Sequence, residues 1–225
     1  MTPAAVLTLA AAGAMLLASS SSSRANVESG EGGPSFDLDN LSDQMENLMN
    51  QLTEQAANVD ADTAGANIAA FLGMIQHAEG TKAAGNPYAV CYGYRHTIQN
   101  FANHPAVTGE WKGERLPDAM CQNAGFGPGC VSTAAGAYQI IKPTWLKVAA
   151  ALGLPDFSPA SQDSAAVDLI RRRGALEDVK AGRLAAAVDK CRNEWASLPG
   201  NYAKQGQRSL DTLALWYQQN GGFLA

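Results

Sequence analysis

The sequence predicts an α+β fold that is mostly helical, with a small irregular β region and an N-terminal arm that is first apolar and then helical. Apolar residues at helical spacing recur in five or six segments of residues 66–225. Residues 81–135 instead contain many Gly, Pro, Asn and aromatic residues without a long periodic run, which is typical of loops and short strands. Helices grouped around such a region define the α+β class.

The first 25 residues form an apolar segment. Its apolar run, residues 3–18, is shorter than the about 20 residues that a membrane-spanning helix needs. The segment lacks the basic start of a signal peptide, although Ser23-Arg24-Ala25 offers a cleavage site with small residues. Three interpretations stay open: a cleaved signal peptide, a weak or transient membrane anchor, and an arm that joins a larger assembly. These interpretations allow residues 1–55 to contact a membrane or a virion assembly.

Residues 26–65 are predicted to form an acidic linker and a short amphipathic helix. Four apolar residues recur there at the spacing of a coiled-coil seam, over less than two heptads: Leu41, Met45, Leu48 and Leu52. A helix that lies on its own domain is the preferred interpretation, and an oligomer is the alternative. The polar residues 58–63 predict a break before the folded domain, which spans residues 66–225.

Turn residues mark the ends of the elements expected in this domain. Gly80 suits the left-handed position after a first helix whose apolar face includes Ile68 and Ile75. Pro143 and Ser158-Pro159 suit helix starts, the second as an N-cap followed by proline. After Gly80, the expected elements are a strand at 137–141 and helices at 143–152, 159–174, 176–180, from 184 to before Pro199, and 207–219.

Charge is divided unevenly along the chain, whose net charge is −5. Residues 1–70 hold nine acidic side chains and one basic side chain, whereas residues 71–225 hold 15 basic and 12 acidic ones. A mildly basic domain behind an acidic arm suits a negatively charged surface, such as a bacterial wall or outer-membrane lipid. The positive surplus is small and no nucleic-acid-binding motif occurs, so no nucleic-acid partner is expected.

The four cysteines are too few and too scattered to staple a small fold. No CxxC or HExxH pattern occurs, so neither a metal nor another cofactor is predicted. Cys121 and Cys130 flank a glycine-rich loop and are the favoured disulfide pair if the protein matures in an oxidising compartment. Free thiols are the alternative.

Glu79 occupies an unusual position for a carboxylate. It follows Leu72 by seven residues and Ile75 by four, so it lies on the apolar face of its helix. It also lies in the last turn, where the helix dipole disfavours negative charge. Burial and dipole both predict a raised pKa, which a general acid near neutral pH needs. Position alone also fits a carboxylate that turns back to water at a frayed helix end.

An ordered set of motifs favours the catalytic interpretation. The motifs are His77-Ala78-Glu79-Gly80-Thr81, Tyr88, Asn103-His104-Pro105, Ser132 to Gln139, Gly153 to Asp163, Arg173 to Leu176 and Trp195 to Gly200. This succession resembles the lambdoid phage endolysin family, whose members are lysozyme-like lytic transglycosylases. The resemblance covers about residues 68–222. The stretch 109–131 is longer than the loop of the family, which leaves the rim of the cleft open.

The resemblance implies a lysozyme-like fold in which Glu79 matches the catalytic glutamate. It also implies that Ala137, Tyr138 and Gln139 line the sugar cleft, with Tyr138 stacking on a sugar ring and Gln139 hydrogen-bonding. Gly136 with Ala137 would let a sugar approach the backbone amides. Tyr88 and His104 complete the predicted substrate-binding set. His104 matches a histidine near the cleft and is predicted to orient Tyr88 or a sugar hydroxyl, or else to be a structural loop residue.

Two further histidines carry no catalytic prediction. His77 lies about 200° around the helix from Glu79 and so faces away from it. His96 belongs to no pattern.

The function implied is cleavage of the bond between N-acetylmuramic acid and N-acetylglucosamine in peptidoglycan, with Glu79 as the single acid and base. The rivals are a hydrolysing muramidase and an inactive virion or wall-binding module. Hydrolysis in the two-carboxylate scheme needs a second carboxylate, and Glu110, Glu114 and Asp118 are the candidates. The expected location is the host periplasm and cell wall, or the phage virion.

Overall fold

The computed structural model describes residues 38–123, 125–201 and 206–225. It divides the chain into two compact units, residues 1–49 and residues 50–225. The predictions for residues 1–37, including the apolar run and its cleavage, lie outside the described residues. Within the described part, no helix combines the length and the apolar character that crossing a bilayer requires.

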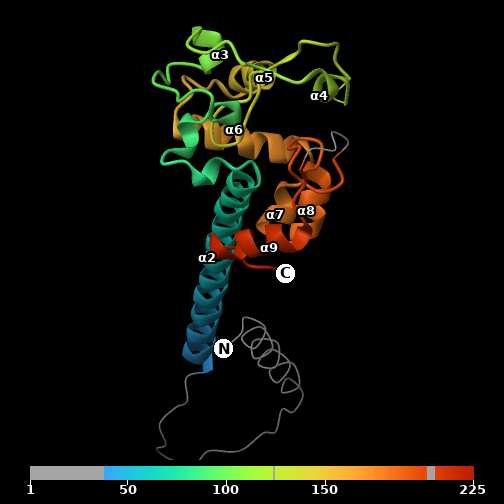
Figure 1. The fold of residues 1–225 in the computed structure, drawn as a ribbon. Helices are drawn as coiled ribbons and strands as arrows, with labels where there is room; N and C mark the ends of the chain where they lie inside the picture. The colour runs from blue at the N-terminus through green and yellow to red at the C-terminus, as the bar shows by residue number, and fades with distance from the viewer. Residues whose placement is uncertain (1–37, 124, 202–205) are drawn as a thin grey trace, which may run out of the picture. The chain divides into compact units, whose positions relative to one another are not determined.

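The helix that ends before Glu79 is much longer than predicted. Helix α2 runs without interruption over Leu38–Ala78, so the break expected at residues 58–63 is wrong (Figure 1). The polar stretch contains neither Gly nor Pro, and each of its residues costs only tenths of a kcal/mol in a helix, so the helix continues through it. The predicted seam lies on α2, where Met45, Leu48 and Leu52 are exposed.

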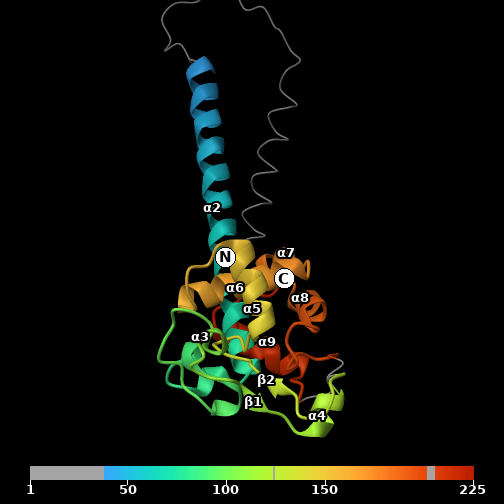
Figure 2. The ribbon, with the colours of Figure 1, turned by 90° about the horizontal axis from the view of Figure 1, so that it is seen from above.

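The unit of residues 50–225 has the predicted α+β composition. Its only sheet among the described residues is an antiparallel pair, β1 (Glu114–Arg115) with β2 (Val131–Ser132). Figure 2 shows this pair and α4 together at one end of the unit. The 3-10 helices are Thr81–Ala83, Pro87–Ala89 and Tyr92–Tyr94, and the remaining helices are α3 (Pro105–Thr108), α4 (Asp118–Asn123), α5 (Lys142–Leu152), α6 (Pro159–Arg172), α7 (Leu176–Lys180), α8 (Leu184–Cys191) and α9 (Leu210–Gln219).

Most predicted helix ends are confirmed. Gly80 has a φ of 79°, and Pro143 lies in the first turn of α5. The Ser158 side chain accepts a hydrogen bond from the backbone N–H of Ser161 and so caps α6. Helix α8 ends earlier than expected, at Cys191, and the chain then turns through Trp195. Neither α3 nor α4 was predicted, because both are too short to show apolar periodicity.

Residues 137–141 do not form the predicted strand. The chain makes a tight turn there, closed by paired backbone hydrogen bonds of 3.1 and 3.0 Å between Ala135 and Ile140. Gly136 and Gln139 adopt positive φ angles of 76° and 48°, which an extended strand cannot contain. The alternation of residue types resembles a strand, but the glycine permits the turn. We call residues 135–140 the cleft turn.

The core forms around the C-terminal half of α2. Phe71, Met74 and Ile75 are fully buried there, and burial of each such side chain contributes roughly 1.5–3 kcal/mol. Trp145 of α5 packs edge-on against Phe157 at 4.7 Å between ring centroids. Because the end of α2 is enclosed by the core, the backbone that carries Glu79 is held rigidly.

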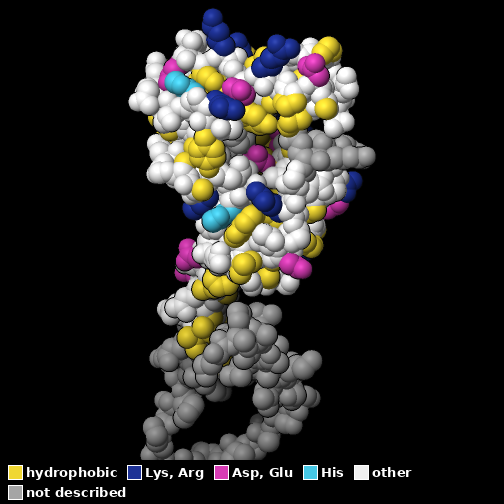
Figure 3. All heavy atoms as spheres, in the orientation of Figure 1, with side chains coloured by type: hydrophobic (Ala, Val, Ile, Leu, Met, Phe, Trp, Pro, Cys, Tyr) yellow, Lys and Arg dark blue, Asp and Glu magenta, His cyan; other side chains and the backbone are white. Residues whose placement is uncertain are grey.

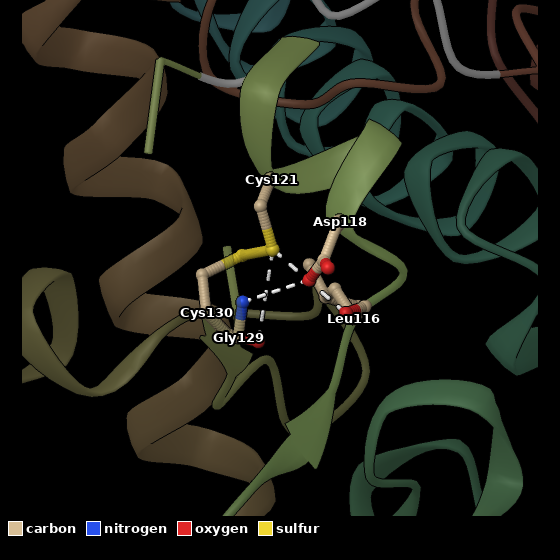
Figure 4. The surroundings of a disulfide bond; sticks show 5 residues. All are labelled: Leu116, Asp118, Cys121, Gly129 and Cys130. Carbon is tan, nitrogen blue, oxygen red and sulfur yellow. Dashed lines mark hydrogen bonds between the residues drawn. A yellow bond between two sulfur atoms is a disulfide. The ribbon is translucent and has the colours of Figure 1, made fainter. Parts of the chain in front are cut away.

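The disulfide predicted between Cys121 and Cys130 is present (Figure 4). It fixes the loop between α4 and β2, where the Gly129 N–H donates to the Asp118 carboxylate at 2.9 Å. The Leu116 N–H donates to the Cys130 carbonyl at 3.0 Å. The stretch that is longer than the loop of the family is thus cross-linked by a disulfide and by hydrogen bonds. Cys91 and Cys191 are free and buried.

Loss of this disulfide is expected to destabilise the folded protein. The two cysteines are nine residues apart, and closing a loop of that size stabilises by about 2–3 kcal/mol in the chain-entropy model. Urea unfolding of a Cys121→Ser/Cys130→Ser variant should show this loss in the free energy of unfolding. Reductant should destabilise the wild type similarly and leave the double variant unchanged. Equal stability of both proteins without reductant would contradict the prediction.

Candidate active site

Glu79 lines a cavity of about 530 Å³. Four parts of the chain contribute its described lining: Ala78, Glu79 and Thr81; Val90 with residues 92–94; Leu116 with Ser132, Ala134, Gln139 and Ile141; and residues 194–197 with Gly206. All lie in the unit of residues 50–225. Hydrophobic and acidic side chains gather around a hollow near the middle of the face shown in Figure 3. The cavity therefore offers a carboxyl group in a recess with apolar walls.

Glu79 directly follows the last residue of α2. Its N–H still donates to the Ile75 carbonyl at 2.9 Å, so the side chain keeps its helical direction before Gly80 turns the chain. Burial raises the pKa of the Glu79 carboxyl, and hydrogen bonds from Ser197 and the positive charge of Arg208 partly oppose this rise. A carboxyl with a raised pKa can stay protonated nearer neutral pH, as a general acid requires.

Ser197 is the direct hydrogen-bond partner of Glu79. Its Oγ donates to Glu79 Oε1 at 2.6 Å, across 118 residues of sequence. Ser197 lies in the turn after α8, where the Trp195 indole N–H donates to the Tyr138 carbonyl at 3.1 Å. The motif analysis included Ser197 within the run from Trp195 to Gly200 but assigned it no role. A hydroxyl donor in this place orients the carboxyl group and favours its charged form.

Of the residues predicted to bind substrate, Gln139 lies at the cavity with Glu79. Its Nε2 donates to the carbonyls of Val90 and Gly136, at 3.2 and 3.0 Å. These bonds hold the side chain across the cleft turn. The partly buried amide is thus positioned at the cavity wall.

Gly136, Ala137 and Tyr138 are buried, which corrects their predicted contacts with a sugar. The Ala137 N–H donates to Gln162 Oε1 at 2.9 Å, and its carbonyl accepts from Thr81 Oγ1 at 2.7 Å, so its backbone groups are already used. The Tyr138 ring is 1% exposed and its hydroxyl donates to Asp163 at 2.5 Å. Its ring is therefore covered and cannot stack on a sugar.

These buried residues instead tie the cleft turn to its surroundings. Thr81 joins the turn to the end of α2, and Gln162 joins it to α6. Trp195 joins it to the segment that carries Ser197. The cleft turn thereby fixes the distance between Glu79 and Ser197. Its buried residues, Gly136, Ala137 and Tyr138, hold the site together, and Gln139 is the residue of the turn that reaches the cavity.

His104 and Tyr88 also lie away from the cavity. His104 is fully buried, its Nδ1 accepts from the Ala106 N–H at 3.1 Å and its Nε2 lies 3.0 Å from the Ile140 carbonyl. Burial lowers the pKa of His104 to about 4, so the ring is neutral and Nε2–H is the donor. Tyr88 faces a separate hollow and donates to Asp163 at 3.3 Å. The structural alternative for His104 is the one observed.

Two aromatic residues at the cavity were not predicted. Tyr92 and Tyr94 line it from the 3-10 helix Tyr92–Tyr94, and Tyr94 is 58% exposed. The Tyr94 hydroxyl donates to the Gly80 carbonyl beside Glu79. Exposed aromatic rings at a recess provide faces for sugar rings. Their sequence signal was weak, because the segment around them has no periodicity.

The three carboxylates proposed for water activation lie outside the cavity lining. Glu110 accepts hydrogen bonds from the backbone of Gln99 and interacts with His96 at 2.8 Å, and these interactions lower its pKa. Glu114 pairs with Arg95, and Asp118 accepts from Gly129. All three have roles in the β region and its loop. The structure therefore does not support them as second catalytic groups.

Glu194 is the other acidic residue among the described residues of the lining. Arg173 holds its carboxylate in an ion pair at 2.7 Å. A desolvated carboxyl with a hydroxyl donor, in a recess edged by aromatic rings, is the arrangement expected of a lysozyme-like glycosidase.

Comparison with known proteins identifies the family. The Endolysin family model matches residues 69–224. The endolysin of Escherichia phage P2 is 39% identical over 69% of this chain and 93% of its own length, and the endolysin of Escherichia phage lambda is 34% identical over 68% and 90%. The chain belongs to the endolysin family, as the motifs predicted.

Solved structures confirm the lysozyme-like fold. Bacteriophage lambda lysozyme complexed with a chitohexasaccharide matches with a TM-score of 0.61 at 33% identity, covering 71% of this chain and 97% of that one. A second structure of lysozyme from bacteriophage lambda matches with a TM-score of 0.57 at 31% identity and the same coverage. The match and the mostly helical composition establish the predicted fold class.

Proposed function

We propose that this endolysin is a peptidoglycan lytic transglycosylase with Glu79 as its only catalytic acid and base. The observation that carries the proposal is the desolvated carboxyl of Glu79 at the cavity. The other acidic residue of the described lining, Glu194, forms an ion pair with Arg173. Membership of the endolysin family supports the substrate class. The sugar complex of lambda lysozyme supports a glycan strand as the ligand of the cavity.

The reaction needs no activated water. Protonated Glu79 donates its proton to the glycosidic oxygen as the bond from C1 of the muramic sugar to that oxygen breaks. The C6 hydroxyl of the same sugar then bonds to C1, and its proton passes to the Glu79 carboxylate. The products are a 1,6-anhydro end and a free 4-hydroxyl on the glucosamine, and Glu79 regains its starting form.

The cavity contributes in three ways. Burial favours the protonated form of Glu79 for the first step, and the Ser197 hydroxyl stabilises the carboxylate for the second. Tyr92 and Tyr94 offer ring faces to the sugars. Intramolecular attack starts from a nucleophile already attached to the substrate, which gives a high effective concentration.

Product analysis tests this function. Purified peptidoglycan digested with the wild-type protein should release muropeptides with 1,6-anhydromuramic ends, identified by mass spectrometry and resistant to borohydride reduction. Reducible muramic ends would instead indicate a hydrolysing muramidase, for which Glu194 is the candidate second carboxylate. Absence of any released fragment would indicate the wall-binding or virion module.

Residues 1–65 are proposed to deliver the domain rather than to take part in the chemistry. The described residues that line the cavity all come from residue 78 onward. Delivery would bring the domain to the host wall from the periplasm, during lysis, or from a virion, during entry.

A further inference from the structure

Arg208 is linked to Glu79 through Ser197. It directly precedes Ser209, the N-cap of α9. The Arg208 N–H donates to the Ser197 carbonyl at 2.9 Å. The Ser197 hydroxyl in turn donates to Glu79 Oε1 at 2.6 Å. The backbone of Arg208 is therefore two hydrogen bonds from the catalytic carboxyl.

The Arg208 side chain is held from a second direction. Its guanidinium carbon lies 5.8 Å from the centroid of the Trp216 ring, over the ring face. The same ring stacks on His77, with centroids 5.2 Å apart and planes inclined by 14°. His77 belongs to the last turn of α2, two residues before Glu79. Trp216 thus contacts both Arg208, which is hydrogen-bonded to Ser197, and His77, which lies two residues before Glu79. We call these three side chains the Trp216–His77 stack on Arg208.

The charge state of His77 suits this stack. Burial, together with the positive charge of Lys82, lowers the pKa of His77. The ring is therefore neutral at neutral pH and does not repel the Arg208 cation. The prediction that His77 faces away from Glu79 agrees with its contact with Trp216, and its ring acts as a support.

We propose that Arg208 is a positioning residue for the reaction, held by the Ser197 carbonyl and the Trp216–His77 stack so that its charge stabilises the Glu79 carboxylate. The proposal rests on the function proposed above, because it assigns Arg208 to the step in which Glu79 is charged. A cation there counteracts part of the effect of burial, so that the same group can both give and take a proton.

Among the residues that the structure describes, the other ionisable groups at the cavity do not supply this charge. Glu194 is paired with Arg173, and the Tyr94 hydroxyl donates to the Gly80 carbonyl. Tyr92 lines the cavity and carries no basic group. Arg208 is the cation whose charge lowers the pKa of Glu79. Removal of this charge should therefore raise that pKa.

The test compares Arg208→Met, Arg208→Lys and Arg192→Met over a range of pH, using initial rates on purified peptidoglycan below saturation. Methionine keeps the contact with Trp216 but removes the charge, and lysine keeps the charge. Arg192 pairs with exposed Asp189 on the surface, so Arg192→Met removes an equal charge elsewhere and controls for attraction to the wall.

Glu79 must be protonated at the start, so the rate falls as pH rises through its pKa. We expect this alkaline limb to shift to higher pH in Arg208→Met, and to stay at the wild-type position in Arg208→Lys and Arg192→Met. Coincident limbs in Arg208→Met and the wild type would overturn the proposal.

If the Arg208→Met variant is inactive, the pKa of Glu79 can still be measured by NMR titration of its ¹³C-labelled carboxyl. A pKa of Glu79 that is higher in this variant supports the assignment, and an unchanged pKa refutes it. Reducible products from an active wild type would refute the proposed transglycosylase function instead, so the two failures are distinguishable.

Discussion

Glu79→Gln is expected to abolish glycan cleavage while leaving the fold intact. Glutamine keeps the shape of the side chain and still accepts the Ser197 hydrogen bond, which is 2.6 Å long in the wild type. It cannot deliver a proton to the leaving oxygen, and general acid catalysis contributes about 10²–10⁴-fold to rates. Released muropeptide, measured against purified peptidoglycan, should fall below a few per cent of the wild-type rate.

Two further variants serve as controls for this result. Glu177→Gln changes an exposed carboxylate on α7 that pairs with Lys180, and it should keep full activity. Glu194→Gln removes the other acidic residue of the cavity and should reduce the rate far less than Glu79→Gln. Substantial turnover by Glu79→Gln, with an unchanged melting temperature, would remove Glu79 from the catalytic role.

Gly136→Ala should be among the most destabilising single substitutions in the domain. An added Cβ would lie 2.1 Å from Gln162 Oε1 and 3.1 Å from the Phe157 ring. Gln162 is fully buried and its amide nitrogen donates to the Phe157 carbonyl at 2.8 Å, so it cannot move aside without breaking hydrogen bonds. Overpacking and left-handed strain together should cost about 2–5 kcal/mol.

Two other glycines separate these contributions. Gly80 shares the positive φ but has open space around an added Cβ, so Gly80→Ala should show the strain alone, about 1–2 kcal/mol. Gly85 has neither restriction, and Gly85→Ala should stay within about 0.5 kcal/mol of the wild type. Equal unfolding free energies for all three variants would show that the cleft turn tolerates a side chain.

The position of Glu79 could be predicted because it follows from helical periodicity. Ile75 and Leu72 precede it by four and seven residues on one face of α2, and both are buried as expected. The same rule places His77 on another side. Local spacing suffices here because a helix fixes the direction of every side chain it carries.

Side-chain directions in the cleft turn could not be predicted in this way. Tyr138 points to Asp163, and the Ala137 N–H to Gln162, each 25 residues further along the chain. A turn with two positive φ angles has no repeating direction, so a tyrosine beside the cleft is not thereby exposed to it. Ser197 was equally inaccessible to local reasoning, because its contact with Glu79 depends on how distant segments pack.

Digestion in water enriched in oxygen-18 tests the central claim most directly. If the C6 hydroxyl of the muramic sugar attacks C1, no solvent oxygen enters the product, and the anhydromuropeptides should carry no label. The structure places one desolvated carboxyl at the cavity beside an ion-paired Glu194, which matches a reaction without an activated water. Reducing muramic ends that carry oxygen-18 at C1 would contradict the account and make this endolysin a hydrolase.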